Sequence, residues 1–147
     1  MPNIKAVTIL LVEDDPGHAR LSEKNMRRSN ITNQIMIFAN GQQALDYLFA
    51  SGEYTENHPQ WPVLMLLDLN LPGLDGYQVL KRMKHDERTK RIPVIILTTT
   101  DDTHEVVKCY DLGCNVYVTK PVDYTQFSEA IRKIGLFLSV VTVPNGE

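Results

Sequence analysis

The stretch VLMLLDLNLP (Val63–Pro72) combines an uninterrupted apolar run with an abrupt polar end. Apolar side chains at every position are typical of a strand that is covered on both faces of a parallel sheet. The run gives way to polar residues at Asp68 and Asn70. The stretch therefore predicts a buried strand with polar chemistry at its carboxyl end.

Three other strand-like runs end in the same way. They are Val7–Val12 before Glu13-Asp14-Asp15, Ile92–Leu97 before Thr98-Thr99-Thr100, and Val116–Val118 before Thr119-Lys120-Pro121. The carboxyl ends of neighbouring strands in an open parallel sheet meet at one crevice. We therefore expect three acids, a hydroxyl and an ammonium group in a single pocket.

Strand-like and helix-like segments alternate five times, which predicts an α/β fold with a (βα)5 parallel sheet. The expected strands are Val7–Val12, Gln34–Ala39, Val63–Leu69, Pro93–Thr98 and Val116–Thr119. The expected helices start near Pro16, Asn40, Asp75, Thr103 and Asp123. Asp15 and Pro16 are typical of a helix N-terminus, and Gly113 is typical of the residue after a helix.

Length and composition limit the class of protein. The chain has 147 residues, of which 43% are hydrophobic, and a net charge of −3. These values predict a single domain over residues 1–147, with a core at about 7–138 and a C-terminal extension at 139–147. There is no basic face for nucleic acid and no apolar run long enough to cross a membrane. We expect a cytoplasmic protein in which Cys109 and Cys114 are free thiols.

Two stretches fit the alternating pattern less well. Ser51–Pro62 is a long polar connection, for which we expect a surface loop rather than a docking loop. The segment Ser139–Glu147 retains three valines after the last expected helix, so we expect it to pack on another surface.

The acids predict a metal site. Three carboxylates from Glu13, Asp14 and Asp68 within a few ångströms oppose joint ionisation unless a cation neutralises them. Oxygen ligands without His or Cys point to a hard cation, most plausibly Mg²⁺, which usually shares its coordination sphere with a phosphoryl group. Asp68 ends the most buried strand and is the best candidate nucleophile for an aspartyl phosphate.

The remaining polar residues match the needs of phosphoryl transfer, which spreads negative charge over three oxygens. Lys120 could pair with the phosphate, Thr98 could turn its hydroxyl toward it, and the main-chain carbonyl of Asn70 could bind the metal. Singly, each residue is better explained as a helix cap, a packing residue or a turn. Their coincidence at one end of four strands favours the pocket.

Four motifs make the chain resemble the receiver domain of two-component response regulators, from about Val7 to Leu138. They are LLVED (Leu10–Asp14), LLDLNLPGLDG (Leu66–Gly76), PVIILTT (Pro93–Thr99) and YVTKP (Tyr117–Pro121). The resemblance implies the doubly wound, flavodoxin-like receiver fold with strand order 2-1-3-4-5.

The resemblance also implies roles at the metal site. Asp68 would accept the phosphoryl group and bind Mg²⁺. Asp14 would bind the ion directly, Glu13 through water and Asn70 through its main-chain carbonyl.

A second set of roles concerns the switch. The resemblance implies that Thr98 is the switch hydroxyl, Lys120 the cation that pairs with the phosphate, and Tyr117 an aromatic that swings inward on activation. It also implies a cis Lys120–Pro121 bond. Thr99 stands where many family members have a smaller residue, which would narrow access to the phosphoryl group.

Two further features narrow the resemblance. The loop 51–62 and the tail sequence VTVP (Val141–Pro144) are similar to those of small stand-alone response regulators paired with cyanobacterial phytochrome histidine kinases. The resemblance therefore implies that a histidine kinase, with a phytochrome as the candidate, donates the phosphoryl group. It also implies that no DNA-binding output domain follows the last expected helix.

The functional hypothesis is a phosphorylation switch that is not an enzyme, beyond catalysing its own phosphotransfer and dephosphorylation. The alternative is a Mg²⁺-dependent phosphohydrolase with an aspartyl nucleophile, which needs a second acid two residues later as general acid/base. That position is Asn70. A flavin-binding role is weaker, because Glu13, Asp14 and Asp15 would repel a phosphate.

Apolar residues near the C-terminal helices exceed what one domain needs to cover its core. They are Tyr110, Tyr117, Phe137, Val140, Val141 and Val143. Contiguous apolar patches usually mark an interface, so we expect a homodimer through this region. The simpler alternative is that these residues cover the sheet edge of their own chain.

Overall fold

The structure is a computed structural model of the chain. It describes residues 8–28, 33–51, 63–99, 103–114, 116–119, 125–126, 129–130 and 132–133, with Thr98 and Thr103 described by their main chain only. The predicted loop 51–62 beyond Ser51, the tail 139–147 and the helix cap Asp123 lie outside these residues.

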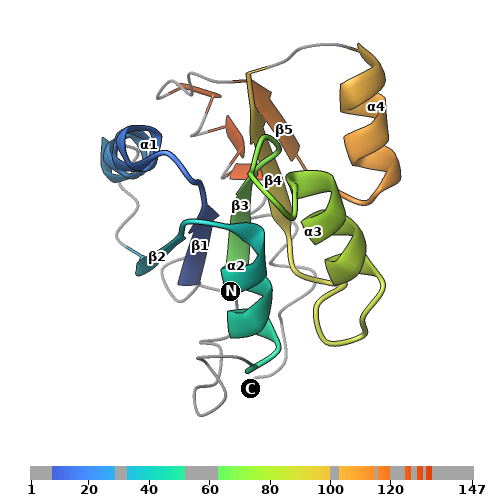
Figure 1. Cartoon of the computed structure of the whole chain (residues 1–147). Helices are drawn as coiled ribbons and strands as arrows, with labels where there is room; N and C mark the ends of the chain where they lie inside the picture. Colours follow the sequence, from blue (N-terminus) through green and yellow to red (C-terminus); the bar gives the residue numbers. More distant parts are fainter. Residues whose placement is uncertain are drawn as a thin grey trace.

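Five parallel strands form one sheet in the order β2-β1-β3-β4-β5 (Figure 1). They are β1 (Thr8–Val12), β2 (Ile35–Phe38), β3 (Val63–Asp68), β4 (Val94–Thr98) and β5 (Val116–Thr119). This order confirms the predicted doubly wound α/β fold. Each observed end lies within one residue of the predicted end.

Four helices connect the strands in the described part of the chain. They are α1 (Pro16–Arg28), α2 (Gly41–Leu48), α3 (Gly76–Lys84) and α4 (Thr103–Asp111). Residues 125–126, 129–130 and 132–133 are also helical and follow β5, where the last helix was expected. None of the helices in the described ranges is long and apolar enough to cross a membrane.

Side-chain caps fix where α1, α2 and α3 begin. The Asp15 carboxylate accepts hydrogen bonds from the main-chain N–H groups of Gly17 (2.8 Å) and His18 (3.0 Å). Asn40 caps α2 in the same way, and Asp75 forms a reciprocal capping box in α3. Each cap satisfies N–H groups that the helix leaves without an internal partner. The predicted N-terminal residues of these helices are thus confirmed.

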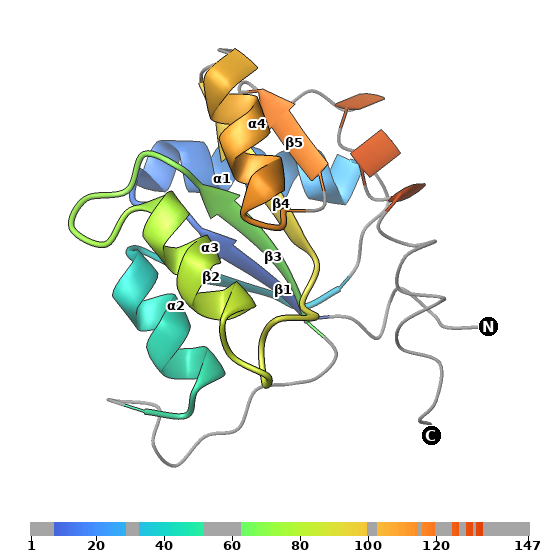
Figure 2. The same ribbon diagram turned by 90° about the vertical axis from the view of Figure 1, so that its right-hand side faces the viewer.

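Helices cover both faces of the sheet (Figure 2), and the core has two layers, one on each face. Alternate residues of β1 and β3 point to opposite faces, because side chains in a strand alternate. Leu10 and Met65 belong to the cluster that packs under α2, α3 and α4. Leu11 and Leu66 belong to the cluster that packs under α1 and includes Ala130. The strands are therefore buried on both faces, as the apolar runs predicted.

Both cysteines are free thiols, as predicted, and both are buried. Burial raises the pKa of the Cys114 thiol to about 12, and it also raises the pKa of Cys109. Gly113 lies between α4 and β5 with φ at +101°, the left-handed conformation expected of a residue after a helix.

Ala50 follows α2 with φ at 51°, a left-handed conformation that costs a non-glycine residue about 1 kcal/mol. We therefore expect Ala50→Gly to raise the free energy of unfolding by about 1 kcal/mol, as measured by urea denaturation. The control is Ala39→Gly, because Ala39 is exposed and does not have a positive φ. Equal or lower stability of Ala50→Gly would contradict this expectation.

Candidate functional site

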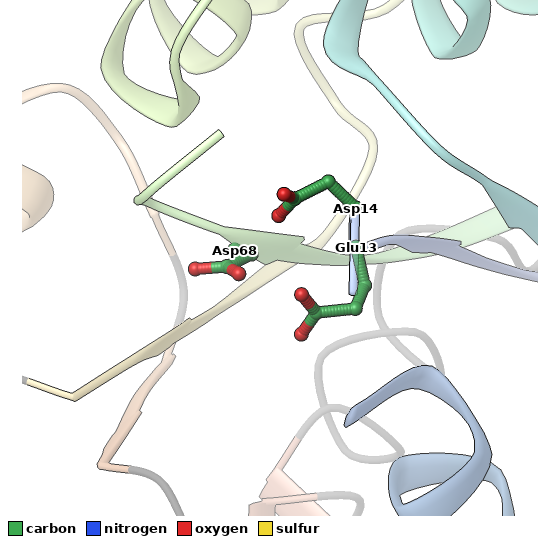
Figure 3. Close-up of side chains that lie close together, drawn as sticks. All are labelled: Glu13, Asp14 and Asp68. Carbon is green, nitrogen blue, oxygen red and sulfur yellow. The ribbon is translucent and has the colours of Figure 1, made fainter. Parts of the chain in front are cut away.

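The register of the sheet brings the polar strand ends together at one edge. Val12 of β1 pairs with Leu67 of β3, so Glu13, the first residue after β1, lies beside Asp68, the last residue of β3. Asp68 pairs in turn with Leu97 of β4. Figure 3 shows the side chains of Glu13, Asp14 and Asp68 converging beyond these strand ends.

The three acids form a compact cluster. Glu13, Asp14 and Asp68 each offer a carboxylate oxygen, and these oxygens all lie within 4.8 Å of one another. Glu13 is 2% exposed and Asp68 is 4% exposed, whereas Asp14 is open to solvent. The site therefore has two buried acids and one that faces solvent.

Main-chain N–H groups orient the two buried carboxylates. The N–H of Asn70 donates to Oδ1 of Asp68 at 3.0 Å, across the turn that follows β3. The N–H of Asp15 donates to Oε2 of Glu13 at 3.2 Å, just before α1 begins. Each acid is thus positioned by the loop after its own strand.

The chemistry of this cluster fits a hard divalent cation. Two unit charges 4.8 Å apart repel each other by about 3 kcal/mol at an effective dielectric constant of about 20. A cation bound between the carboxylates attracts each of them, and this attraction outweighs their mutual repulsion. Carboxylate oxygens are also the ligands that hard cations prefer. The described residues near the cluster thus offer a site that could hold such an ion, with Asp68 on its buried side.

The other predicted site residues are described less fully. Thr98 pairs with Thr119 at the same edge of the sheet, but its side chain is not described. Lys120 and Pro121 lie outside the described residues. Tyr117 lies in β5 opposite Ile96 and is half-buried.

Two residues beside the cluster were not predicted from the sequence. His18, in the first turn of α1, places its ring nitrogens 4.0 Å from Oε2 of Glu13 and from Oδ2 of Asp15. His18 could have been found from the sequence, because it lies three residues after Asp15, the residue predicted to cap the helix.

The second overlooked residue is Gly76, which packs against the main chain of the phospho-acceptor candidate. A Cβ atom on Gly76 would lie 2.6 Å from the carbonyl oxygen of Asp68 and 2.7 Å from Cα of Leu69. Gly76 could have been found from the Asp75-Gly76 pair, which stands at the predicted start of a helix.

Comparisons with known proteins agree with this geometry. The family model described as the response regulator receiver domain matches residues 9–132. The response regulator Rcp1 of Synechocystis sp. is 40% identical over 137 residues, which cover 92% of each chain. The solved structure of its Mn²⁺-bound form has a TM-score of 0.75 and covers 95% of this chain and 99% of the other, with 38% identity.

Two more solved structures are similar over nearly the whole chain. A response regulator receiver domain from Rhodospirillum rubrum is 53% identical, with a TM-score of 0.74, and the match covers 94% of this chain and 97% of the other. The phosphorylated cyanobacterial phytochrome response regulator RcpA is 35% identical, with a TM-score of 0.74 and coverage of 95% and 99%.

A parallel sheet in the order 2-1-3-4-5 with clustered acids at the carboxyl ends of β1 and β3 is the arrangement expected of a signalling receiver. The chain belongs to the response regulator receiver domain family. It is therefore a two-component response regulator.

Proposed function

We propose that Asp68 accepts a phosphoryl group from the phosphohistidine of a histidine kinase. A carboxylate oxygen of Asp68 attacks phosphorus, the P–N bond breaks, and the imidazole leaves with the electron pair. The observation that carries this proposal is the position of Asp68, which is 4% exposed at the end of β3 and within 4.8 Å of two further acids.

We infer that the resident cation is Mg²⁺. Asp14 and Asp68 would bind it directly, Glu13 through water and Asn70 through its main-chain carbonyl. When bound, the ion would neutralise the charge of the acids and of the incoming phosphoryl group. The compact set of oxygen donors supports this assignment, and Rcp1 has been solved with Mn²⁺.

Thr98 and Lys120 complete the proposed site. The pairing of Thr98 with Thr119 supports this, because Lys120 directly follows Thr119 in the sequence. The Thr98 hydroxyl would donate a hydrogen bond to a phosphoryl oxygen, and the Lys120 ammonium would pair with its charge. Their movement toward the phosphoryl group would bias a conformational switch that includes Tyr117.

We propose a phytochrome histidine kinase as donor in the cytoplasm, with autodephosphorylation of Asp68 ending the signal. The support is similarity to RcpA, whose solved structure is that of a phosphorylated cyanobacterial phytochrome response regulator. Addition of candidate phytochrome kinases with ATP would identify the donor by transfer of labelled phosphate.

Phosphorylation by a small donor tests the function without a kinase. With acetyl phosphate and Mg²⁺, we expect intact mass spectrometry to show the addition of one PO₃ group. With EDTA, we expect the adduct to fall at least about tenfold, because loss of the ion leaves the acids uncompensated. An equal yield with EDTA would contradict the metal assignment.

The same preparation separates the proposal from a phosphohydrolase. An aspartyl-nucleophile hydrolase needs a general acid/base close to the nucleophile, and the residue two positions after Asp68 is Asn70. We expect no multiple turnover of a generic phosphomonoester such as p-nitrophenyl phosphate. Sustained turnover that is lost in Asp68→Asn would favour the alternative.

Homodimerisation through the C-terminal helices and tail remains a proposal. Tyr110 is 48% exposed and Val107 is 50% exposed on the outer side of α4, which supports an apolar interface there. Phe137, Val140, Val141 and Val143 lie outside the described residues. We expect sedimentation velocity to detect a dimer at micromolar concentration. A monomer both with and without phosphorylation would rule the dimer out.

A further inference from the structure

A tyrosine just beyond the acceptor loop links α3 to α4. Tyr77 is the second residue of α3, and its hydroxyl donates a hydrogen bond to the carboxylate of Glu105 in the first turn of α4. The ammonium group of Lys108 lies 4.1 Å from the centroid of the Tyr77 ring. One phenol thus contacts two oppositely charged side chains of α4 that are three residues apart.

The environment of this contact keeps the phenol protonated. Burial, followed by the hydrogen bond to Glu105, raises the pKa of Tyr77 well above its ordinary value. The buried Cys109 thiol also lies beside the hydroxyl. Tyr77 therefore remains a donor to a carboxylate, and hydrogen bonds to charged acceptors are about twice as strong as neutral ones.

The main chain next to Tyr77 is fixed relative to Asp68. The N–H of Gly76 donates to the carbonyl oxygen of Leu69 at 3.2 Å. The space between Gly76 and the Asp68 carbonyl does not admit even a Cβ atom. Because Tyr77 directly follows Gly76, we expect a shift at the end of β3 to displace Tyr77 as well.

A second phenol, that of Tyr110 in α4 itself, reaches the neighbouring strand β5. Burial raises the pKa of Tyr110, and a hydrogen bond with the main chain of Tyr117 in β5 partly opposes this rise. Tyr110 therefore connects α4 to β5, while Tyr77 connects it to α3. Figure 1 shows α4 at the side of the molecule, next to β5 and α3.

We propose that the contact of Tyr77 with Glu105 and Lys108, which we term the α3–α4 tie, holds α4 in its unphosphorylated position. Breaking the tie lowers the cost of moving α4 and so favours the phosphorylated conformation. This inference rests on the proposed function, because it requires that phosphorylation of Asp68 shifts a conformational equilibrium.

Beryllofluoride, a stable mimic of a phosphoryl group on a carboxylate, measures this equilibrium when added with Mg²⁺. Tyr77→Phe removes the donor and keeps the ring over which Lys108 lies. Glu105→Ala removes the acceptor, whereas Glu105→Gln keeps an acceptor oxygen. We expect the first two variants to bind beryllofluoride about fivefold more tightly than wild type, and Glu105→Gln to bind within about twofold of wild type.

Asp111→Ala is the matched control, since Asp111 is an exposed carboxylate on the same helix. It is expected to leave beryllofluoride affinity unchanged. In ¹⁵N NMR spectra without beryllofluoride, we expect the α4 amide peaks of Tyr77→Phe to move along the line joining the free and beryllofluoride-bound wild-type positions. A merely structural role for Tyr77 would not produce collinear shifts.

Three results would overturn the tie. The first is wild-type or weaker affinity in both Tyr77→Phe and Glu105→Ala. The second is an equal increase in beryllofluoride affinity in Asp111→Ala, which would indicate a general effect of removing negative charge from α4. The third is that wild-type protein fails to bind beryllofluoride at all, and this result alone would also remove the proposed function.

Discussion

Replacing Asp68 with asparagine is expected to abolish phosphorylation by acetyl phosphate while leaving the fold intact. The amide has nearly the same shape, so it can still accept the hydrogen bond from the N–H of Asn70. It lacks the negatively charged oxygen that attacks phosphorus. Intact mass spectrometry after incubation with Mg²⁺ should show no added PO₃ group, and circular dichroism should match that of wild type.

The stability of the same variant provides an independent measurement. Asparagine at position 68 removes one of three like charges that lie within 4.8 Å of one another. In EDTA, we therefore expect Asp68→Asn to be more stable than wild type by about 1 kcal/mol or more. The advantage should shrink or reverse with Mg²⁺, because binding of the ion stabilises the folded wild-type protein.

Asp75→Asn is a matched control for the chemical change. Asp75 caps α3, and asparagine is an equally good capping residue. This variant is expected to be phosphorylated to the wild-type extent. Full modification of Asp68→Asn, or its loss in Asp75→Asn, would be inconsistent with Asp68 as the acceptor.

The largest expected loss of stability is in Gly76→Ala. The added Cβ would lie 2.6 Å from the Asp68 carbonyl oxygen and 2.7 Å from Cα of Leu69. Both neighbours are main-chain atoms at the end of a central strand, so neither can move without shifting the sheet. We expect the free energy of unfolding to fall by about 3 kcal/mol and phosphorylation to slow, because Asp68 is displaced.

Gly17→Ala is the control for the loss of a glycine. The nearest atom to a Cβ at this position is Oδ1 of Asp15, at 3.2 Å, and this side chain can move by a few tenths of an ångström. Urea denaturation should show a change below about 1 kcal/mol, since alanine is also the better helix former. Similar stabilities of the two variants would refute the close packing of Gly76 on Asp68.

The sheet and three of its flanking helices were predictable because local signals agreed with one another. The run before Asp68 is apolar at every position, which predicted a strand buried on both faces, and the change to polar residues placed its end within one residue. Pro16 after Asp15 marked the start of α1 in the same way. The acidic cluster then followed from topology alone, since parallel strands present their carboxyl ends at one edge.

Other features of the structure could not be predicted, because they depend on contacts or conformations that no local sequence pattern encodes. Tyr77 and Glu105 are 28 residues apart, and their hydrogen bond depends on how α3 and α4 pack together. Ala50 adopts a conformation more typical of glycine, so the end of α2 carried no sequence signal. The side-chain roles of Thr98 and Lys120 remain predictions.

The two core layers have a consequence for assembly. Among the described residues, the cluster under α1 and the cluster under α2, α3 and α4 lie on opposite faces of the sheet, because alternate strand residues serve opposite faces. A protein that binds the helices on one face of the sheet therefore leaves the helices on the opposite face accessible. A histidine kinase and an output partner could then bind the same receiver at the same time, and the kinase would not need to dissociate before the output partner binds.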